Sequence, residues 1–195
     1  NANSTAVVLI GYQNDYFAED GVLRGVIEEA DRNQHILENT LTLLEQVKDL
    51  PTTLIQTPII FTDDYSELTN PVGILKAVKD ANAFREGTKG GDTIDSFKDY
   101  GERILTVHGK RGLNAFSNTE LEKTLDSKGI KHVVLAGAVT SICIDSTGRA
   151  AHERGYSVSI LSDCTASRTP MEQEFYCENI FPLYAEVLDS KTLLA

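Results

Sequence analysis

Cys143 is the residue of this chain whose type and surroundings best suit covalent chemistry. An apolar run at 133–136 precedes it, and Gly137 interrupts that run. This pattern predicts a buried strand, a sharp turn and a helix that holds the cysteine in its first turn. The unpaired amides and the positive dipole end at that place favour a thiolate and can hold an oxyanion. The stretch therefore predicts nucleophilic attack on a carbonyl, with a buried structural cysteine as the alternative.

The residues around Cys143 also predict where its helix starts and ends. Thr140 or Ser141 can cap the start, because each hydroxyl can accept a hydrogen bond from an unpaired amide. Gly155 is a residue type that ends helices. Open α/β sheets bind ligands at the carboxyl ends of their strands, so this placement favours a functional cysteine.

Polar residues also follow two other predicted strands. Gln13 comes directly after the apolar run 5–12, and His108 and Lys110 come directly after a run at 103–107. Polar groups at a carboxyl strand end belong to a pocket mouth or to a plain turn, and the residues alone leave both interpretations open.

Strands alternate with helices along the chain. Apolar, β-branched runs predict strands at 5–12, 54–61, 103–107, 133–136, 157–161 and 185–188. Helical spacing predicts helices at 28–50, 72–78, 119–127 and 170–178, besides the one that holds Cys143. The alternation predicts a three-layer α/β/α fold with a doubly wound, mostly parallel six-stranded sheet, in a single domain that spans 1–195. The irregular stretch 62–99 contains a glycine-rich loop at 87–91, and we expect it to form a lid.

Net charge and cysteine usage narrow the range of partners. The chain has 195 residues and a net charge of −11, which argues against nucleic acid and anionic membranes as partners. No apolar run approaches the roughly 20 residues of a membrane span. The three cysteines show no pairing pattern, which favours a reducing, cytoplasmic location over a disulfide framework. The four histidines lack metal-ligand spacing, so we expect neither a metal nor a cofactor.

Three separated segments resemble the isochorismatase-like cysteine hydrolases. TAVVLIGYQNDYF is similar to the opening strand of that family, which reads apolar residues, Asp, any residue, Gln and then Asn-Asp-Phe. GKRGLNAFSNTELEKTL resembles its lysine segment, and GAVTSICIDSTGRAAHERGYSVSILSDCTAS resembles its cysteine block. The order and spacing agree over nearly the whole chain. The family includes nicotinamidases, N-carbamoylsarcosine amidohydrolases, other small-amide hydrolases and true isochorismatases.

The resemblance implies a catalytic triad of Asp, Lys and Cys. Cys143 matches the nucleophile and Lys110 matches the lysine beside it, whereas Gly11 stands where the family has the Asp. It also implies a cis peptide bond between Ala138 and Val139, with the backbone amides of Val139 and Cys143 as an oxyanion hole. The Asp-x-His metal motif of nicotinamidases is missing from 61–65, so the resemblance implies no metal.

The activity that the resemblance implies is cleavage of a C–N bond in a small amide through a thioester on Cys143. Such cleavage needs a proton donor for the leaving nitrogen, and Gly11 has no side chain to supply one. Asp15 and His108 are the candidates to replace the missing acid. The alternative is a catalytically inactive member of the family that binds a small molecule or serves in assembly. A further possibility is that Gly11 replaces a native Asp.

The substrate-contacting residues that we expect are Gln13, Tyr16, Phe17 and Phe84, which lie near the first strand and in the predicted lid. Each of the three aromatic residues also suits a place in the core. The partner that these residues imply is a small-molecule substrate, and the resemblance implies a homodimer or a homotetramer.

Overall fold

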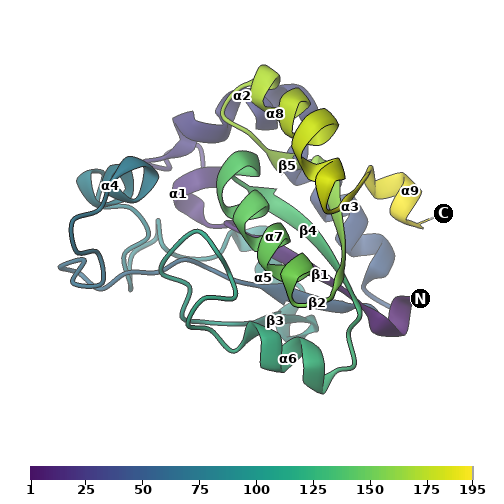
Figure 1. Cartoon of the computed structure of the whole chain (residues 1–195). Helices are drawn as coiled ribbons and strands as arrows, with labels where there is room; N and C mark the ends of the chain where they lie inside the picture. Colours follow the sequence, from purple (N-terminus) through teal and green to yellow (C-terminus); the bar gives the residue numbers. More distant parts are fainter. Residues whose placement is uncertain (195) are drawn as a thin grey trace.

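The computed structural model describes residues 1–194, and its centre is one six-stranded sheet (Figure 1). Each neighbouring pair of strands runs parallel, and the order across the sheet is β3-β2-β1-β4-β5-β6. The strands are β1 (Thr5–Ile10), β2 (Thr53–Gln56), β3 (Ile104–Thr106), β4 (His132–Ala138), β5 (Ser157–Ala166) and β6 (Glu186–Leu188). The predicted α/β fold with a parallel six-stranded sheet is confirmed.

The two central strands, β1 and β4, are buried on both faces. Alternate side chains of β1 enter different cores: Val7 and Leu9 enter one, and Val8 and Ile10 enter the other. This explains the continuous apolar run in the sequence, because a strand covered on both faces has no polar side. The two strands pair from Thr5 opposite His132 to Ile10 opposite Gly137, so both end at the same edge of the sheet.

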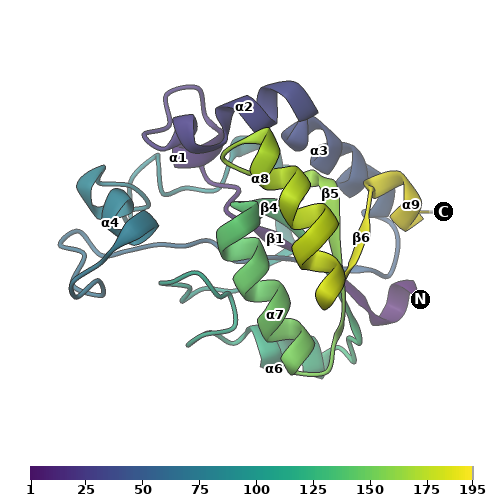
Figure 2. The same cartoon turned by 45° about the horizontal axis from the view of Figure 1, so that its top comes forward.

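Helices cover both faces of the sheet, which makes three layers (Figures 1 and 2). The helices α2 and α3 pack in the core that holds Val7, and α6 and α7 pack in the core that holds Val8. The helices are α1 (Asn14–Phe17), α2 (Arg24–Gln34), α3 (Ile36–Val47), α4 (Gly73–Asp80), α5 (Asp95–Lys98), α6 (Leu121–Ser127), α7 (Asp145–Glu153), α8 (Pro170–Phe175) and α9 (Ser190–Leu194). Within residues 1–194, none of them has both the length and the apolar character that a bilayer crossing requires.

Several predicted elements differ from those observed in their bounds, and two of these differences have a clear local cause. The single helix predicted at 28–50 is two helices, because His35 adopts a left-handed conformation with φ of 55° between α2 and α3. The strand predicted at 54–61 ends at Gln56, and Pro58 follows in the irregular segment. A proline cannot donate to a sheet ladder, which accounts for the early end of β2.

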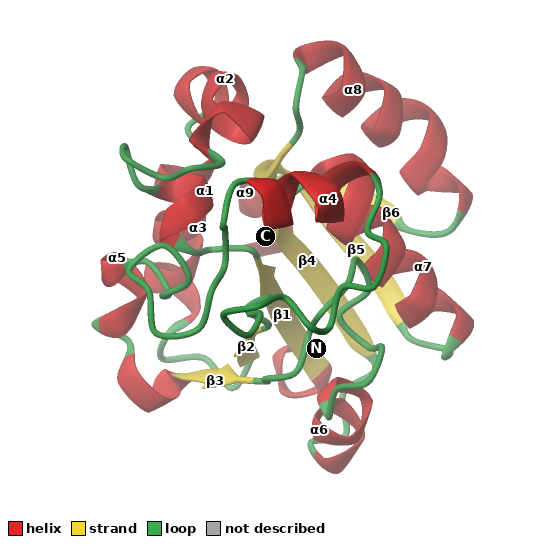
Figure 3. Ribbon diagram, turned by 90° about the vertical axis from the view of Figure 1, so that its left-hand side faces the viewer, coloured by secondary structure: helices red, strands yellow, loops and turns green. Residues whose placement is uncertain are grey.

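The segment between β2 and β3 lies over the carboxyl edge of the sheet. Figure 3 looks toward this edge, with α4 and the neighbouring loops in front of the ends of β1 and β4. The amide of Phe61 donates to the carbonyl of Phe84, and the amide of Glu86 donates back to Phe61, both at 2.8 Å. These bonds hold together the two ends of the stretch that contains α4, so the predicted lid has a defined structure.

Candidate active site

Cys143 lies in the turn that joins β4 to α7. The peptide bond between Ala138 and Val139 is cis, as the resemblance implies. One π-helical turn, Thr140–Ile144, follows and leads into α7. Cys143 is 8% exposed in this turn, and the amide of Ile144 donates to the carbonyl of Val139 at 3.2 Å. The cysteine is thus held at the carboxyl edge of the sheet, as the sequence predicts.

The hydroxyls of Thr140 and Ser141 do not cap the helix, and this part of the prediction is wrong. Val139 is the residue at the cap position, without a side-chain bond to the helix. Thr140 instead donates to Oε1 of Gln173 at 2.6 Å, and Ser141 donates to a carboxylate oxygen of Glu172. These two bonds tie the cysteine turn to α8. The predicted end of the helix at Gly155 is confirmed, because helix α7 ends at Glu153 and Gly155 has a φ of +87°.

Lys110 brings a positive charge to the sulfur of Cys143. It is 1% exposed and pairs with Ile59 through an isolated parallel bridge beyond the end of β3. Its Nζ lies 3.4 Å from Sγ of Cys143 and donates to the carbonyl oxygen of Gly112 at 2.6 Å. Within residues 1–194, no ion pair joins Lys110 to a carboxylate. A buried ammonium without a carboxylate partner favours a negative charge on a neighbouring group.

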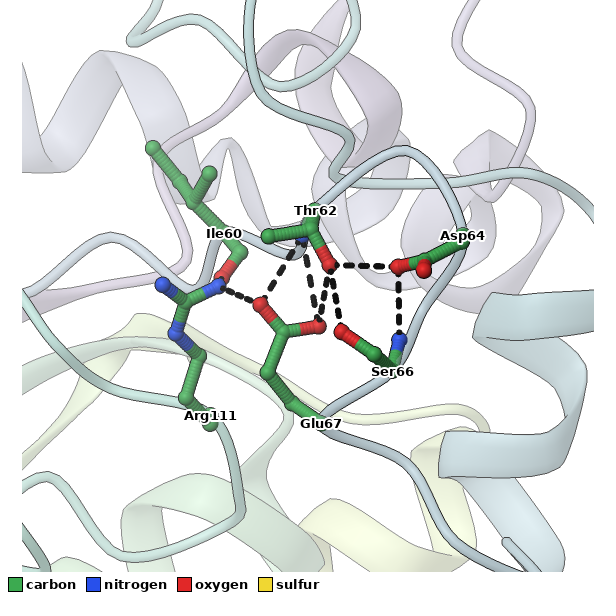
Figure 4. Close-up of polar contacts among 6 residues, drawn as sticks. All are labelled: Ile60, Thr62, Asp64, Ser66, Glu67 and Arg111. Carbon is green, nitrogen blue, oxygen red and sulfur yellow. Dashed lines mark hydrogen bonds and ion pairs between the residues drawn. The ribbon is translucent and has the colours of Figure 1, made fainter.

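A polar cluster next to Lys110 fixes the loop that carries it (Figure 4). Arg111 donates to Oε1 of Glu67 at 2.6 Å and to the carbonyl of Ile60. Glu67 in turn accepts hydrogen bonds from the amide and the hydroxyl of Thr62, at 3.0 and 2.9 Å. Burial opposes the ionisation of Glu67, but backbone amides, the Thr62 hydroxyl and the Arg111 charge outweigh it and lower the pKa of Glu67. The cluster thereby ties the lysine loop to the segment that follows β2.

Gly11 lies where β1 ends, with a φ of +78°. A Cβ atom built there would come within 3.0 Å of the carbonyl oxygen of Ala138 and within 3.4 and 3.5 Å of the ring of Tyr16. A side chain at this position would therefore be strained by its φ and crowded by the turn before Cys143.

A small apolar cavity joins several of the predicted site residues. Its volume is about 20 Å³, roughly the room for one water molecule. Cys143 and Lys110 supply its sulfur and its charge, and aliphatic or aromatic side chains form most of the remaining wall. The lining residues are Ile10, Gly11, Tyr16, Ile59, Ile74, Leu75, Val78, Phe84, Lys110, Leu113, Ala138 and Cys143.

Two of the predicted substrate contacts, Gln13 and Phe17, lie outside this cavity. The Gln13 amide bonds both backbone groups of Ile59 and the carbonyl of Gly91, at 2.8–2.9 Å, so its side chain is engaged in holding the cavity wall. Phe17 stacks on Tyr12 in the core, with ring centroids 5.0 Å apart. Tyr16 and Phe84 do line the cavity, and their rings meet edge to face at 5.0 Å.

Neither candidate for the missing acid reaches the cavity. The buried carboxylate of Asp15 accepts a hydrogen bond from the amide of Phe84 at 2.7 Å and packs against Gly90. His108 is exposed just before the lysine loop. Asp15 is therefore an anchor for the lid, a role that the sequence did not reveal because its partner lies 69 residues further along the chain. Among residues 1–194, no three His, Cys, Asp or Glu side chains gather as they would around a metal.

Sequence reasoning also missed most of the cavity wall. Ile74, Leu75 and Val78 reach it from α4, and Leu113 reaches it from the lysine loop. The apolar spacing of α4 was a signal for a buried face, but not for what that face covers.

Comparison with known proteins gives a consistent set of relatives. Residues 5–192 match the isochorismatase domain model. The chain is 24% identical over 158 residues to nicotinamidase 3 of Arabidopsis thaliana, covering 81% of this chain and 77% of that protein. It is 25% identical over 180 residues to the ureidoacrylate amidohydrolase of Enterobacter sp. (strain 638), covering 85% and 76%. A solved cysteine hydrolase from Pseudomonas syringae pv. phaseolicola has the same fold, with a TM-score of 0.83 at 20% identity over 100% of this chain and 92% of that one.

Proposed function

This chain belongs to the isochorismatase family of hydrolases, and from that premise we propose that it cleaves a C–N bond of a small amide through a thioester on Cys143. The two curated relatives named above act, by their names, on an amide and on a ureido compound, both of which contain C–N bonds at a carbonyl. The observation that carries the proposal is the 3.4 Å separation of Lys110 Nζ and Cys143 Sγ in an apolar cavity. The ammonium stabilises the thiolate, which is the reactive form of a cysteine.

The proposed reaction has two stages. The sulfur of Cys143 attacks the carbonyl carbon, and the backbone amides of Val139 and Cys143 hold the oxyanion that forms. Collapse of this intermediate breaks the C–N bond and leaves an acyl group on the sulfur. Water then attacks the thioester, and the acid product and the free cysteine are released.

The cavity limits the substrate to a small acyl group. Its walls are apolar apart from the groups at Cys143, Lys110 and Tyr16, so an uncharged acyl portion fits it better than a charged one. Tyr16 and Phe84 are the aromatic residues positioned to contact that portion. A volume of about 20 Å³ holds little more than a water molecule, so entry of a substrate requires some of the lining side chains to move outward.

We also propose a cytoplasmic location and a homodimeric or homotetrameric state. Cys143, Cys164 and Cys177 are all free cysteines, which agrees with a reducing compartment. Sedimentation equilibrium of the purified protein tests the oligomeric state, and a monomer at micromolar concentration would contradict a dimer or tetramer.

Amide turnover tests the proposed activity. The protein is incubated with a panel of small amides that includes nicotinamide, acetamide and ureido acids, and the release of ammonia or amine is followed. We expect release from at least one compound, its loss in Cys143→Ala, and its retention in the matched control Cys177→Ala. Release that survives in Cys143→Ala would overturn the thioester route. Alkylation of Cys143 by iodoacetamide without any turnover would instead support a binding protein.

A further inference from the structure

The cavity beside Cys143 lacks the acid that amide cleavage requires. Among the residues of 1–194 that line it, Lys110 is the charged one and none carries a carboxylate. Asp15, the nearest acid in sequence to Gly11, is held by the amide of Phe84. If the chain cleaves amides as proposed above, a different side chain must protonate the leaving nitrogen.

Tyr16 occupies the side of the cavity where that acid is missing. A Cβ atom at Gly11 would contact Cδ2 and Cε2 of the Tyr16 ring at 3.4 and 3.5 Å, so the ring borders the space next to Gly11. The residue is 4% exposed and lines the same cavity as Cys143 and Lys110. Edge-to-face packing on Phe84, with ring planes at 66°, fixes its orientation.

Within the part of the chain that the structure describes, the hydroxyl of Tyr16 differs from those of two other buried tyrosines. The other two are hydrogen-bonded, since Tyr12 bonds Thr40 at 2.7 Å and Tyr65 donates to the carbonyl of Ala83 at 2.6 Å. No hydrogen bond joins the Tyr16 hydroxyl to any group in residues 1–194. The oxygen is not among the fully buried side-chain atoms that lack a partner, so it keeps some contact with solvent and is free to bond a ligand that enters the cavity.

The charge of the sulfur acts on this hydroxyl. Burial raises the pKa of Tyr16, and the negative charge of Cys143 raises it further. Tyr16 therefore keeps its proton while the thiolate is present. Attack on a carbonyl carbon makes the sulfur neutral and moves its negative charge to the oxyanion that the backbone amides hold. The charge that opposes ionisation of the hydroxyl has therefore left the sulfur before the C–N bond breaks.

We propose that the Tyr16 hydroxyl is the catalytic acid of this site, in place of the carboxylate that Gly11 lacks. In the tetrahedral intermediate, the oxyanion re-forms the carbonyl, the C–N bond breaks with its electron pair going to nitrogen, and nitrogen takes the proton from the Tyr16 O–H. The products are an amine, a thioester and a tyrosinate in the cavity that Lys110 also lines. The tyrosinate then takes a proton from the attacking water, and the C–S bond breaks with its pair returning to sulfur.

The Tyr16→Phe variant removes the oxygen and keeps the ring that packs on Phe84. Two substrates with the same acetyl group separate the roles, since 4-nitrophenyl acetate releases a stable phenolate without a proton and 4-nitroacetanilide must protonate its nitrogen. The measurement is the rate of Cys143 acylation by each compound. We expect Tyr16→Phe to slow acylation by the anilide about 100-fold. The rate of acylation by the ester should change less than about threefold. Tyr156→Phe, whose hydroxyl bonds Asp126 on the opposite face, is the matched control.

Other outcomes overturn the inference in distinguishable ways. Equal loss with both compounds would show a structural role for Tyr16, and no loss with either would assign the proton to Lys110. Acylation of the unsubstituted protein by the ester but never by the anilide would also count against Tyr16 as an acid. Failure of both compounds to acylate Cys143 would overturn the proposed function itself.

Discussion

The Nζ atom of Lys110 lies 3.4 Å from the Sγ atom of Cys143, although 33 residues separate them in the chain. Both residues are almost fully buried, and no carboxylate from residues 1–194 lines the cavity that they share. The positive charge is therefore balanced best by a negative charge on the sulfur. The proposed reactivity of Cys143 rests on this pairing.

Replacing Lys110 with Met removes this charge and keeps a side chain of similar length. A unit charge about 4 Å away is worth about 4 kcal/mol at an effective dielectric constant of 20, so the variant loses a large attraction for a negatively charged sulfur. We expect iodoacetamide to alkylate Cys143 at least tenfold more slowly at pH 7. Lys123→Met, at an exposed surface lysine, is the control. An unchanged alkylation rate in Lys110→Met would show that the ammonium does not activate the sulfur.

Gly11→Ala tests how tightly the end of β1 is built. At a φ of +78° the new Cβ atom is strained and also lies 3.0 Å from the Ala138 carbonyl oxygen. We expect a loss of about 1–3 kcal/mol in the free energy of unfolding, measured with urea. Gly129→Ala is matched, because Gly129 has a φ of +67° and open space where its Cβ would lie. Equal losses at both positions would show that the contact with Ala138 is unimportant.

The same crowding predicts the result of placing an acid at position 11. In Gly11→Asp the side chain starts against the Ala138 carbonyl and the Tyr16 ring, and it would displace the ring from the cavity. We therefore expect turnover of small amides to stay the same or to fall. A large rise in turnover would indicate instead that the chain descends from an enzyme disabled at this position.

The ionisation of Glu67, which holds the lysine loop, makes the free energy of unfolding depend on pH. Its folded pKa is lower than the unfolded value of about 4.3, so its contribution to stability is complete above that value and is lost as the pH falls through the folded pKa. We expect Glu67→Gln to lower the unfolding free energy at pH 7 by about 1–3 kcal/mol, and this difference to shrink as the pH falls through the folded pKa. Glu120→Gln, at an exposed ion pair, is the control. If the two proteins still differed in unfolding free energy below the folded pKa of Glu67, the stabilising role given to its ionised carboxylate would be contradicted.

Asp15 anchors the lid through the amide of Phe84. Asp15→Ala leaves that buried N–H without a partner, at a cost of about 1–3 kcal/mol. We expect hydrogen exchange at Phe84 and its neighbours to speed up by about tenfold to hundredfold, while exchange in β1 and β4 stays the same. Unchanged exchange at Phe84 would mean that other contacts hold the lid.

The sheet could be predicted well from the sequence because a strand that is buried on both faces has apolar residues at consecutive positions. The runs that became β1 and β4 are of this kind, and they placed Cys143 correctly at the carboxyl edge. The break at His35 escaped prediction because helical spacing continues through it, and one left-handed residue is enough to separate the two helices. The caps at Thr140 and Ser141 failed because tertiary partners on α8 take both hydroxyls.

The site was predictable in part only. The resemblance paired Lys110 with Cys143, but the role of Asp15 depends on Phe84, and no local pattern connects them. Tyr16 did leave a signal in the sequence. In the segment that resembles the family's opening strand, Tyr16 stands in the place of Phe and Gly11 stands in the place of Asp.

Mapping the acetyl groups left by 4-nitrophenyl acetate tests most directly whether Cys143 is the reactive centre. Burial raises the pKa of Cys164 to about 12 and that of Cys177 to about 11, so these thiols stay protonated at pH 7 and serve as internal controls. After a brief exposure and digestion, mass spectrometry should find the acetyl group on Cys143 alone, and the group should disappear as hydrolysis proceeds. An unlabelled Cys143, or labelling of Cys177 to the same extent, would contradict the role assigned to the Lys110–Cys143 pair.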